Sequence, residues 1–368
     1  MMKINKENWE YKSFLSCIEK VPKPKQLTTS DYKKSGAIPI VSQDAKLITG
    51  YTNHEELKNK FDKPVIVFGD HTRVLKYIDF DFVVGADGVK IIIPKGNLLT
   101  KFLYYFLVWH KIPNLGYARH FKLLKDIMIP IPPINTQNYF ISLFDKYQDL
   151  IFLKQKQLKE FDSLESSVFI KMFGDSVVKE MGWEVKSLGE IGNIITGSTP
   201  STKDKENYEP KEYCFVKPSD LPSKGVANIT TTEYFVSSKG FVLSRALPIG
   251  SVLISCIGTI GKIGILKQVA CSNQQINAII PNRTIDSYYL AYNIAVNKNK
   301  LESMANAPVV PIINKTSFSL FKIAIPPLSL QQSFAQKIEV IEKQKEVVKN
   351  EIAQLQALLD SEMDKYFG

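Results

Sequence analysis

The 368-residue sequence contains only four cysteines, and their spacing pairs none of them. Cys17, Cys214, Cys256 and Cys271 form no Cys-x-x-Cys motif. Neither a zinc site nor a disulfide framework is therefore expected, and we interpret the four residues as buried free thiols in a reducing cytoplasm. No N-terminal segment resembles a signal peptide, and the most apolar windows, such as residues 101–110, are too short to span a bilayer. These absences predict a soluble, cytoplasmic protein.

Complete catalytic motifs are also missing. The run Gly-Thr-Ile-Gly-Lys at 258–262 resembles a phosphate-binding loop, but Cys256 and Ile263 stand where a Walker motif needs a glycine and a Ser or Thr. A methyltransferase would need a glycine-rich cofactor loop and an Asn-Pro-Pro-aromatic or Asp-Pro-Pro-aromatic run, and neither occurs. Acid-x-Lys triplets, which nucleases use, are expected by chance in a lysine-rich chain. We therefore expect no catalytic residue, no metal ion and no cofactor bound by this chain.

Positive charge is concentrated outside two segments of the chain. The net charge is +10, yet residues 135–172 and 331–366 together hold ten lysines and twelve acidic residues, a net charge of −2. The remainder therefore carries +12. A basic surplus of this kind indicates a polyanionic partner, most simply nucleic acid. A basic surface kept for solubility is the alternative.

The two segments that lack the positive surplus, residues 135–172 and 331–366, are copies of each other. Ile-Pro-Pro-Ile-Asn-Thr-Gln at 131–137 returns as Ile-Pro-Pro-Leu-Ser-Leu-Gln at 325–331, and this offset of 194 holds without a gap to the end of the chain. Proline is excluded from helix interiors, so each Pro-Pro pair fixes where a helix begins. Asn135 and Ser329 are suitable N-cap residues, and Ser329 with Gln332 fits a capping box. We predict two helices of about 36 residues, each roughly 54 Å long.

Apolar residues in both predicted helices recur at alternating spacings of four and three, as in a coiled coil. The two stripes predict that the helices bury these positions against each other. The alternative is that each helix packs separately on its own globular neighbour. We call these positions the seam; they are Phe140, Phe144, Tyr147, Ile151, Lys154, Leu158, Phe161, Glu165, Val168 and Met172 in the first helix, and Phe334, Ile338, Ile341, Lys345, Val348, Ile352, Leu355, Leu359, Glu362 and Tyr366 in the second.

The blocks that precede the helices repeat as well. Trp-Glu-Tyr-Lys-Ser-Phe at 9–14 returns as Trp-Glu-Val-Lys-Ser-Leu at 183–188. Each block has an aromatic helical stretch near its end, at 101–110 and 287–296. Turn clusters such as Gly85-Ala86-Asp87-Gly88 separate short β-rich runs. These runs are Ile38–Val41, Val65–Phe68 and Val89–Ile93 in the first block, and Val252–Ile257 and Ile276–Ile280 in the second.

This pattern predicts an α+β fold with an internal repeat. We expect two globular domains, each followed by a long helix, with the helices antiparallel so that the chain gains a pseudo-twofold axis. A short, glycine-bounded linker is expected at Gly174–Gly182. The predicted boundaries are 1–134 for the first domain, 135–173 for its helix, 174–328 for the second domain and 329–368 for its helix.

Two loops of the first block combine glycine, cationic and aromatic residues. Arg and Lys can contact phosphates or guanine edges, and aromatic rings can lie on sugars or bases. Asp70 with His71 could instead be a catalytic pair, but adjacent side chains on a strand point to opposite faces. The candidate DNA-binding residues of this block are Asp70, His71, Thr72, Arg73, Lys76, Tyr117, Arg119, His120 and Lys122.

The second block carries polar residues in four comparable runs. Asn and Gln side chains present the paired donor and acceptor groups that suit adenine. Ordinary turn and strand polarity is the alternative for each of them. The candidate DNA-binding residues here are Ser198, Thr199, Ser201, Lys217, Ser219, Thr259, Lys262, Asn273, Gln274, Gln275 and Lys315.

These features together resemble one family, the specificity (S) subunits of type I DNA restriction-modification enzymes. The resemblance covers nearly the whole chain, and its main carrier is the duplicated architecture. Supporting motifs are the Ile-Pro-Pro helix entries followed by Gln137 and Gln331, Gly-Ser-Thr-Pro-Ser at 197–201, Phe-Gly-Asp-His-Thr-Arg at 68–73 and Gly-Tyr-Ala-Arg-His-Phe at 116–121. The first block departs from the pattern at residues 20–25, where the second has Gly-Ser-Thr-Pro.

The resemblance implies two target-recognition domains that read the two halves of a split DNA sequence in the major groove. It implies that the helices set the spacing of the halves and bind methyltransferase (M) subunits, two in number. Chemistry would come from the M subunits with S-adenosylmethionine and from ATP-driven restriction (R) subunits, with Mg. Since the blocks differ in their loops, the half-sites should differ in sequence. A self-contained nuclease or methyltransferase, and a coiled-coil assembly adaptor, are the competing interpretations.

Overall fold

The computed structural model describes residues 6–22, 24–86, 88–174, 182–306 and 310–368. Most of the predicted linker at Gly174–Gly182, and Asp87 of the predicted turn at 85–88, lie outside the described residues. The chain forms two compact units. Unit 1 comprises residues 1–154 and 350–368, and unit 2 comprises residues 155–349. Each unit therefore contains one globular block and a part of both long helices.

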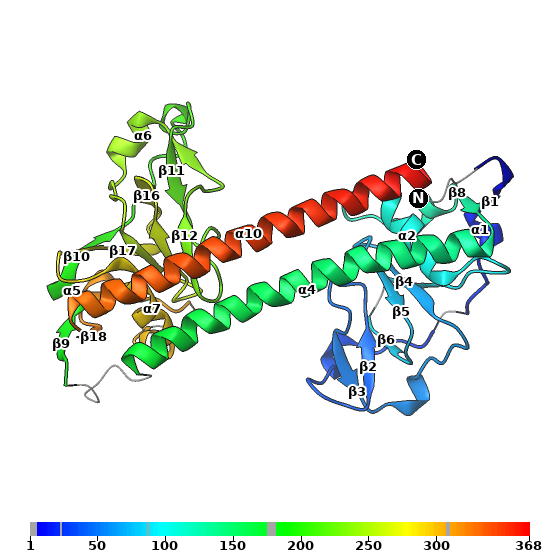
Figure 1. Ribbon diagram of the computed structural model, residues 1–368, viewed down its shortest axis with the longest axis horizontal. Coiled ribbons are helices and arrows are strands. Elements are labelled where there is room, and N and C mark those ends of the chain that lie inside the picture. Colours follow the sequence, from blue (N-terminus) through cyan, green and yellow to red (C-terminus); the bar gives the residue numbers. More distant parts are fainter. Residues whose placement is uncertain (1–5, 23, 87, 175–181, 307–309) are drawn as a thin grey trace. The chain divides into compact units, whose positions relative to one another are not determined.

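Unit 1 is built on three small sheets (Figure 1). Strands β1 and β8 pair antiparallel, β2 pairs with β3 and β6, and β4 lies between β5 and β7. Helix α2 (Thr100–Trp109) buries Phe102, Leu103 and Phe106 beside these sheets. The other elements are β1 (Glu10–Ser13), α1 (Phe14–Cys17), β2 (Ile38–Val41), β3 (Gly50–Thr52), β4 (Val65–Gly69), β5 (Leu75–Ile78), β6 (Val83–Val84), β7 (Val89–Ile92), α3 (Phe121–Leu124) and β8 (Met128–Ile131).

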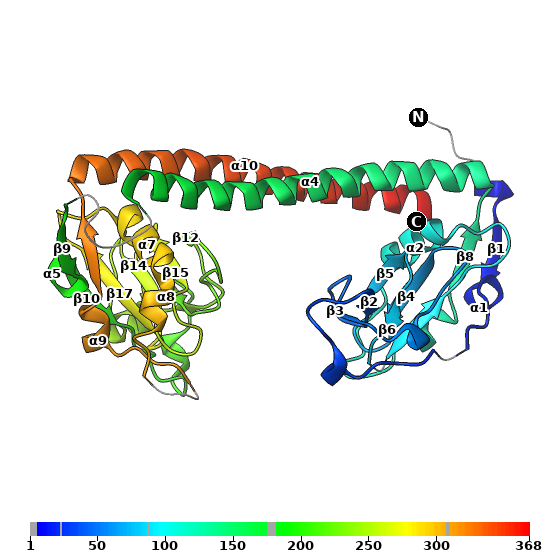
Figure 2. The same ribbon diagram turned by 90° about the horizontal axis from the view of Figure 1, so that it is seen from below.

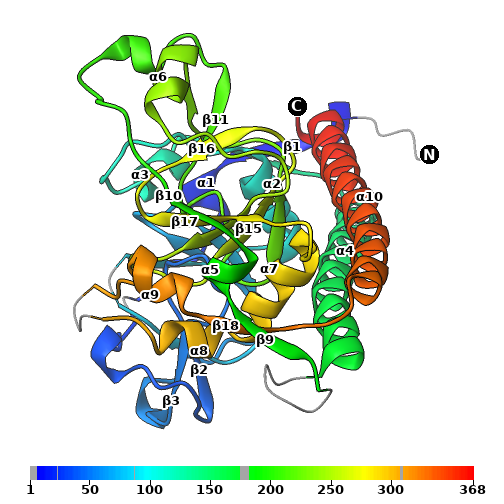
Figure 3. The same cartoon turned by 90° about the vertical axis from the view of Figure 1, so that its left-hand side faces the viewer.

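Unit 2 contains a five-stranded sheet in the order β10-β17-β14-β15-β12. A three-stranded sheet, β13-β11-β16, lies beside α6 and shares an apolar core with the five-stranded sheet (Figures 1 and 3). The elements are β9 (Glu184–Ser187), α5 (Leu188–Ile191), β10 (Gly192–Thr196), β11 (Tyr213–Val216), β12 (Val226–Ile229), β13 (Phe235–Val236), α6 (Ser238–Leu243), β14 (Val252–Ser255), β15 (Ile263–Leu266), β16 (Ala270–Ser272), β17 (Ile276–Pro281), α7 (Ser287–Val296), α8 (Lys298–Glu302), α9 (Lys315–Ser319) and β18 (Lys322–Ile325).

The two units repeat the same strand pairings. The antiparallel pairs β1·β8, β4·β5 and β4·β7 of unit 1 correspond to β9·β18, β14·β15 and β14·β17 of unit 2. The parallel pair β2·β6 corresponds to β11·β16. Unit 2 adds β10 and β12 at the two edges of its central sheet. The predicted α+β repeat is therefore confirmed, and it extends to the strand order, which the sequence did not indicate.

The long helices are α4 (Ile134–Phe173) and α10 (Leu328–Phe367), each of 40 residues. Both are longer than predicted, because each begins directly after its Pro-Pro pair. The carbonyl groups of Pro133 and Pro327 accept the first helical hydrogen bonds, from the amides of residues 136 and 137 and of residues 330 and 331. Asn135 and Ser329 consequently lie inside the first turn, so the prediction that they cap the helices is wrong.

The prediction that the two long helices pack together is confirmed. All twenty seam positions are buried or half-buried, and a part of α10 lies beside a part of α4 in each unit (Figure 2). In unit 1, the ring centroids of Phe140 and Tyr366 are 4.4 Å apart. In unit 2, those of Phe169 and Phe334 are 5.4 Å apart. The helix ends also pack on α2 and α7, since Phe144 contacts Tyr105 and Phe334 contacts Tyr292. Both packing modes considered from the sequence therefore occur together.

Charged seam residues form ion pairs between the two helices. In unit 2, the Lys345 ammonium lies 3.1 and 3.2 Å from the two carboxylate oxygens of Glu165, which is 2 % exposed. It also lies 2.8 Å from both Asp162 and Glu342. In unit 1, the Lys154 ammonium lies 2.7 Å from Glu351. Of these residues Lys345 and Glu165 are buried, which is tolerable because each is the opposite partner of the other.

Two buried glutamines attach the long helices to their blocks in the same way. The Gln137 side-chain oxygen accepts a hydrogen bond from the Leu99 amide, at the start of α2, and its nitrogen donates to the carbonyls of Asn97 and Pro132. Gln331 likewise accepts from the Asp286 amide, at the start of α7, and donates to the carbonyls of residues 284 and 326. We call this arrangement the glutamine clip. It fixes each long helix to the shorter aromatic helix of its block.

Replacing a clip glutamine should destabilise its own unit. Gln137→Leu and Gln331→Leu each remove the hydrogen-bond partner of one part-buried amide, one part-buried carbonyl and one buried carbonyl, and we expect a loss of about 1–3 kcal/mol in the free energy of unfolding. Gln332→Leu is the matched control, because Gln332 is exposed. Chemical denaturation followed by circular dichroism measures the difference. Equal stability of Q331L and Q332L would contradict the role given to the clip.

The buried carboxylates should make stability depend on pH. Burial raises the pKa of Glu165 to about 7, and a hydrogen bond with Glu342 adds to this rise. Folding therefore favours the protonated acid, and this contribution is lost as pH rises through about 7. Between about pH 5 and about pH 8, the wild type should lose on the order of 1–3 kcal/mol more stability than Glu165→Gln. Denaturation at several pH values tests this, with Glu160→Gln as an exposed control; parallel pH profiles of all three proteins would refute it.

Candidate nucleic-acid interface

In unit 1, the two predicted loops are joined by buried polar residues. The Asp70 backbone carbonyl accepts hydrogen bonds from the His120 amide at 2.8 Å and from its ring Nδ1 at 3.0 Å. The Asp70 carboxylate accepts from the Phe121 amide at 2.8 Å. The other ring nitrogen of His120 accepts from the Leu115 amide. Asp70 and His120 are 3 % and 0 % exposed, so they hold the loops together and are shielded from a ligand.

These bonds place an exposed cationic and aromatic surface beside the β4–β5 turn. Tyr117 is 98 % exposed, and its ring stacks on that of His71 with centroids 5.4 Å apart. Arg119 on the same loop and Lys122 in helix α3 are exposed, as is Thr72 on the turn. We call these residues the unit-1 reading surface. It presents charge for phosphates and a ring for stacking, which are the groups that nucleic acids engage.

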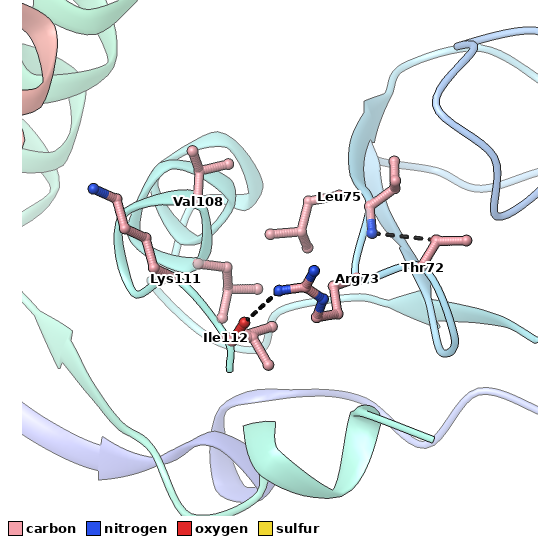
Figure 4. A pocket seen from close by; sticks show the side chains of 8 residues that line it. Thr72, Arg73, Leu75, Val108, Lys111 and Ile112 are labelled. Carbon is pink, nitrogen blue, oxygen red and sulfur yellow. Dashed lines mark hydrogen bonds between the residues drawn. The ribbon is translucent and has the colours of Figure 1, made fainter. Parts of the chain in front are cut away.

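Arg73 and Lys76 of the predicted set form hydrogen bonds with backbone carbonyls inside unit 1. Arg73 adopts a left-handed backbone with φ of 62°, and its guanidinium donates to the Ile112 carbonyl at 3.0 Å (Figure 4). Arg73 and Ile112 line a pocket with Thr72, Val108 and Lys111. Lys76 is buried, donates to the Ser42 and Lys46 carbonyls, and has a pKa lowered by burial. Its ammonium group therefore ties β5 to the loop after β2.

In unit 2, four loops carrying predicted residues meet at the ends of β11, β14, β16 and β17. The Ser198 amide donates to the Ser272 carbonyl, and the Thr199 hydroxyl donates to the Gln274 side chain at 2.6 Å. The Asn273 amide donates to the Val216 carbonyl, next to Lys217. Four runs that are far apart in sequence are thus brought to one place.

The two lysines of this cluster, Lys217 and Lys262, each make a contact within unit 2. The Lys262 ammonium donates to the Pro218 carbonyl at 2.9 Å. The Lys217 ammonium lies 3.1 Å from the centroid of the Tyr234 ring, a cation–π contact. Gln274, Thr259 and Ser219 are exposed, whereas Asn273 is 8 % exposed and donates to the Gln275 side chain. We call Lys217, Lys262, Gln274, Thr259 and Ser219 the unit-2 reading surface.

Ser201 and Lys315 are exposed but lie outside these linked loops. The Ser201 carbonyl accepts from the Asn207 side chain, and Lys315 begins helix α9. Sequence reasoning also missed residues that the structure adds. Gln43 accepts a hydrogen bond from the His71 amide and so supports the β4–β5 turn. Tyr234 makes the cation–π contact with Lys217, but it lies 17 positions further along the sequence, where no local pattern marks it.

Other kinds of site find little support among the described residues. Within them, no group of three or more His, Cys, Asp or Glu side chains could hold a metal ion. The four cysteines are buried and unpaired, and burial raises the pKa of Cys256 to about 12. A thiol of this kind is a poor nucleophile. In the described part of the chain, no helix is long and apolar enough to cross a membrane.

Comparison with known proteins identifies the family. The model of the type I restriction modification DNA specificity domain matches twice, at residues 6–161 and 180–357. The specificity subunit of the type I restriction enzyme EcoR124I/EcoR124II from Escherichia coli is 26% identical over 345 residues, which cover 85% of this chain and 80% of that protein. The two matched segments correspond to the two copies of the repeat.

Solved structures show the same fold. The crystal structure of the type I restriction-modification S subunit from M. genitalium superposes with a TM-score of 0.56 at 16% identity, covering 100% of this chain and 98% of that one. A chain from a study of complex assembly and conformational transition in the type I system gives a TM-score of 0.55 at 16% identity and covers 98% of both chains. The chain thus belongs to the family of type I restriction-modification DNA specificity subunits and, as such a subunit, is non-catalytic by itself.

Proposed function

We propose that this subunit reads a bipartite, asymmetric DNA sequence, with one half-site contacted by each unit. The observation that carries the proposal is the repeat of strand pairings, which presents a reading surface on both units while the residues on those surfaces differ. Equivalent scaffolds with unlike contact residues suit two unlike half-sites on one duplex.

On the unit-1 reading surface, Arg119 and Lys122 contact phosphates or guanine edges, and Tyr117 lies on a sugar or base. On the unit-2 reading surface, the Gln274 amide is suited to adenine, and Lys217 and Lys262 supply positive charge. The buried residues Asp70, Lys76, His120 and Asn273 act indirectly, by holding the loops in position. Ser201 and Lys315 add polar and cationic contacts beside the linked loops of unit 2.

The chemistry of the complex lies on partner subunits. We assign methylation to M subunits that use S-adenosylmethionine, and cleavage to R subunits that use ATP and Mg, in the cytoplasm. The long helices provide the surface for two M subunits. This assignment agrees with the absence of a complete catalytic motif in the sequence and rests on membership of the family.

Arg119→Ala and Lys262→Ala should each weaken binding to the recognised duplex about tenfold, in the range of 1–3 kcal/mol for a lost contact. If the contact is to a phosphate, the slope of log affinity against log salt should also fall by about one. Fluorescence anisotropy with the full chain in its assembled complex measures both quantities. Lys12→Ala is the control, because its side chain is exposed on β1, outside both reading surfaces and the long helices. Unchanged affinity for both R119A and K262A would remove these residues from the interface.

Exchanging residues 182–327 for the corresponding segment of a relative should change one half of the methylated sequence and leave the other intact. The segment begins and ends beside β9 and β18, whose pairing closes the block. Mapping methylated adenines in a genome that carries the exchanged subunit reads out both halves. Retention of both halves would refute the reader role of unit 2, and methylation or cleavage by the isolated chain would instead favour an enzyme.

A further inference from the structure

The ion pairs of the seam have no charged counterparts in the other copy of the repeat. The offset of 194 relates Glu165 to Leu359 and Lys345 to Ile151. Ile151 and Leu359 are 6 % and 1 % exposed and belong to the apolar core of unit 1. One place in the seam is therefore an ion pair in unit 2, and its repeat-related place is apolar in unit 1.

The remaining charged residues follow the same rule. Asp162 and Glu342, which also contact Lys345, correspond to Gln356 and Gln148. The second ion pair, between Lys154 and Glu351, corresponds to Val348 and Gln157. Glu165, Asp162 and Glu351 thus meet a lysine of the opposite copy, whereas Glu342 lies on the same helix as Lys345.

The apolar seam positions do not distinguish pairing of unlike helices from pairing of like helices. Phe140 corresponds to Phe334, Phe144 to Ile338 and Tyr147 to Ile341, so the two helices present similar apolar stripes. A second molecule could offer its own α4 to α4 in the same antiparallel register. Hydrophobic burial is non-directional and would reward that pairing almost as well.

The charges make such like-with-like pairing costly. In an α4·α4 pair, Glu165 would face Ile151 of the other molecule, and Lys154 would lie opposite Gln157 and Asp162. In an α10·α10 pair, Lys345 would face Leu359, and Glu351 would face Val348. By twofold symmetry each mismatch would occur twice. Lys345 would keep Glu342 of its own helix, but Glu165 would be buried without its lysine, which is strongly unfavourable. Glu351, which is half-exposed, would lose Lys154.

We propose that the Glu165–Lys345 and Lys154–Glu351 ion pairs make the seam accept the unlike helix and reject the like helix of a second copy of this chain. Ion pairs in such positions add little stability compared with apolar residues, and their better-attested use is to specify partner and register. This inference concerns assembly of the chain itself and does not depend on which DNA is read.

A cross-linking experiment separates the two kinds of pairing. Since residue 165 would face residue 151 in an α4·α4 pair, residue 158, midway between them, would face its own copy. Leu158→Cys therefore reports on like-with-like pairing through a short bismaleimide cross-linker, while the native cysteines are buried. The full chain is unfolded and refolded at high concentration at about pH 8, and covalent dimer is quantified by electrophoresis. The chain without L158C measures the background.

The test variant carries the uncharged residue of the other copy at all six positions. These changes are E165L, K345I, D162Q, E342Q, K154V and E351Q. We expect at least about a tenfold increase in cross-linked dimer over the charged parent, both with L158C. Equal amounts of dimer in the two proteins would overturn the proposal.

Two further variants keep the test decisive. K154V with E351Q changes only half-exposed side chains, so it folds even if the sixfold variant does not, and it should give an intermediate increase. Adding the reversed pair, K154E with E351K, to the other four changes should lower the dimer again, because the charges once more match only between unlike helices. Two outcomes would count against the proposal that the charges select the unlike helix. One is a dimer yield that stays high with K154E and E351K, and the other is a dimer yield that stays at background with K154V and E351Q.

Discussion

Burial of the aromatic ends of α4 and α10 is the interaction on which both units depend. In unit 1, Phe140 and Phe144 meet Tyr366 and the α2 side chain Tyr105. In unit 2, Phe169 and Phe334 meet Tyr289 or Tyr292 of α7. Each fully buried ring contributes about 1.5–3 kcal/mol, so a few of them match the stability of a whole domain. A 40-residue helix with exposed sides owes most of its stability to packing of this kind.

The sequence predicted this framework because the evidence for it is local or periodic. The Pro-Pro pairs marked the helix starts, the spacing of four and three marked the seam, and the offset of 194 related the two copies. These three sequence signals agree with the structure because they depend on covalent geometry and on the helical period. The N-cap assignment of Asn135 and Ser329 was wrong, because a proline carbonyl can accept the first helical bonds as well as a polar residue's can.

The contact surfaces were predicted less well, for a physical reason. The runs around Asp70 and His120 were singled out for their chemistry, but these residues bond to each other across fifty positions of sequence. Whether a charged or polar side chain points outward depends on such long-range pairing, as Lys76 also shows. The same limit applies to the repeated glutamines, whose recurrence was visible while their hydrogen bonds were not. Burial therefore divides the candidate set into residues that are exposed and residues that shape the loops.

The glutamine clip has a consequence for how such a protein can change in length. Gln137 anchors one end of α4 in rotation as well as in position, since its three bonds reach two different parts of the block. Each residue inserted after it would turn the remainder of the helix by about 100° around its own axis. A single insertion would thus swing the apolar stripe away from α10, whereas seven residues complete nearly two full turns and bring it back. The length of α4 can therefore change only by insertions that return the apolar stripe to nearly the same angle around the helix axis.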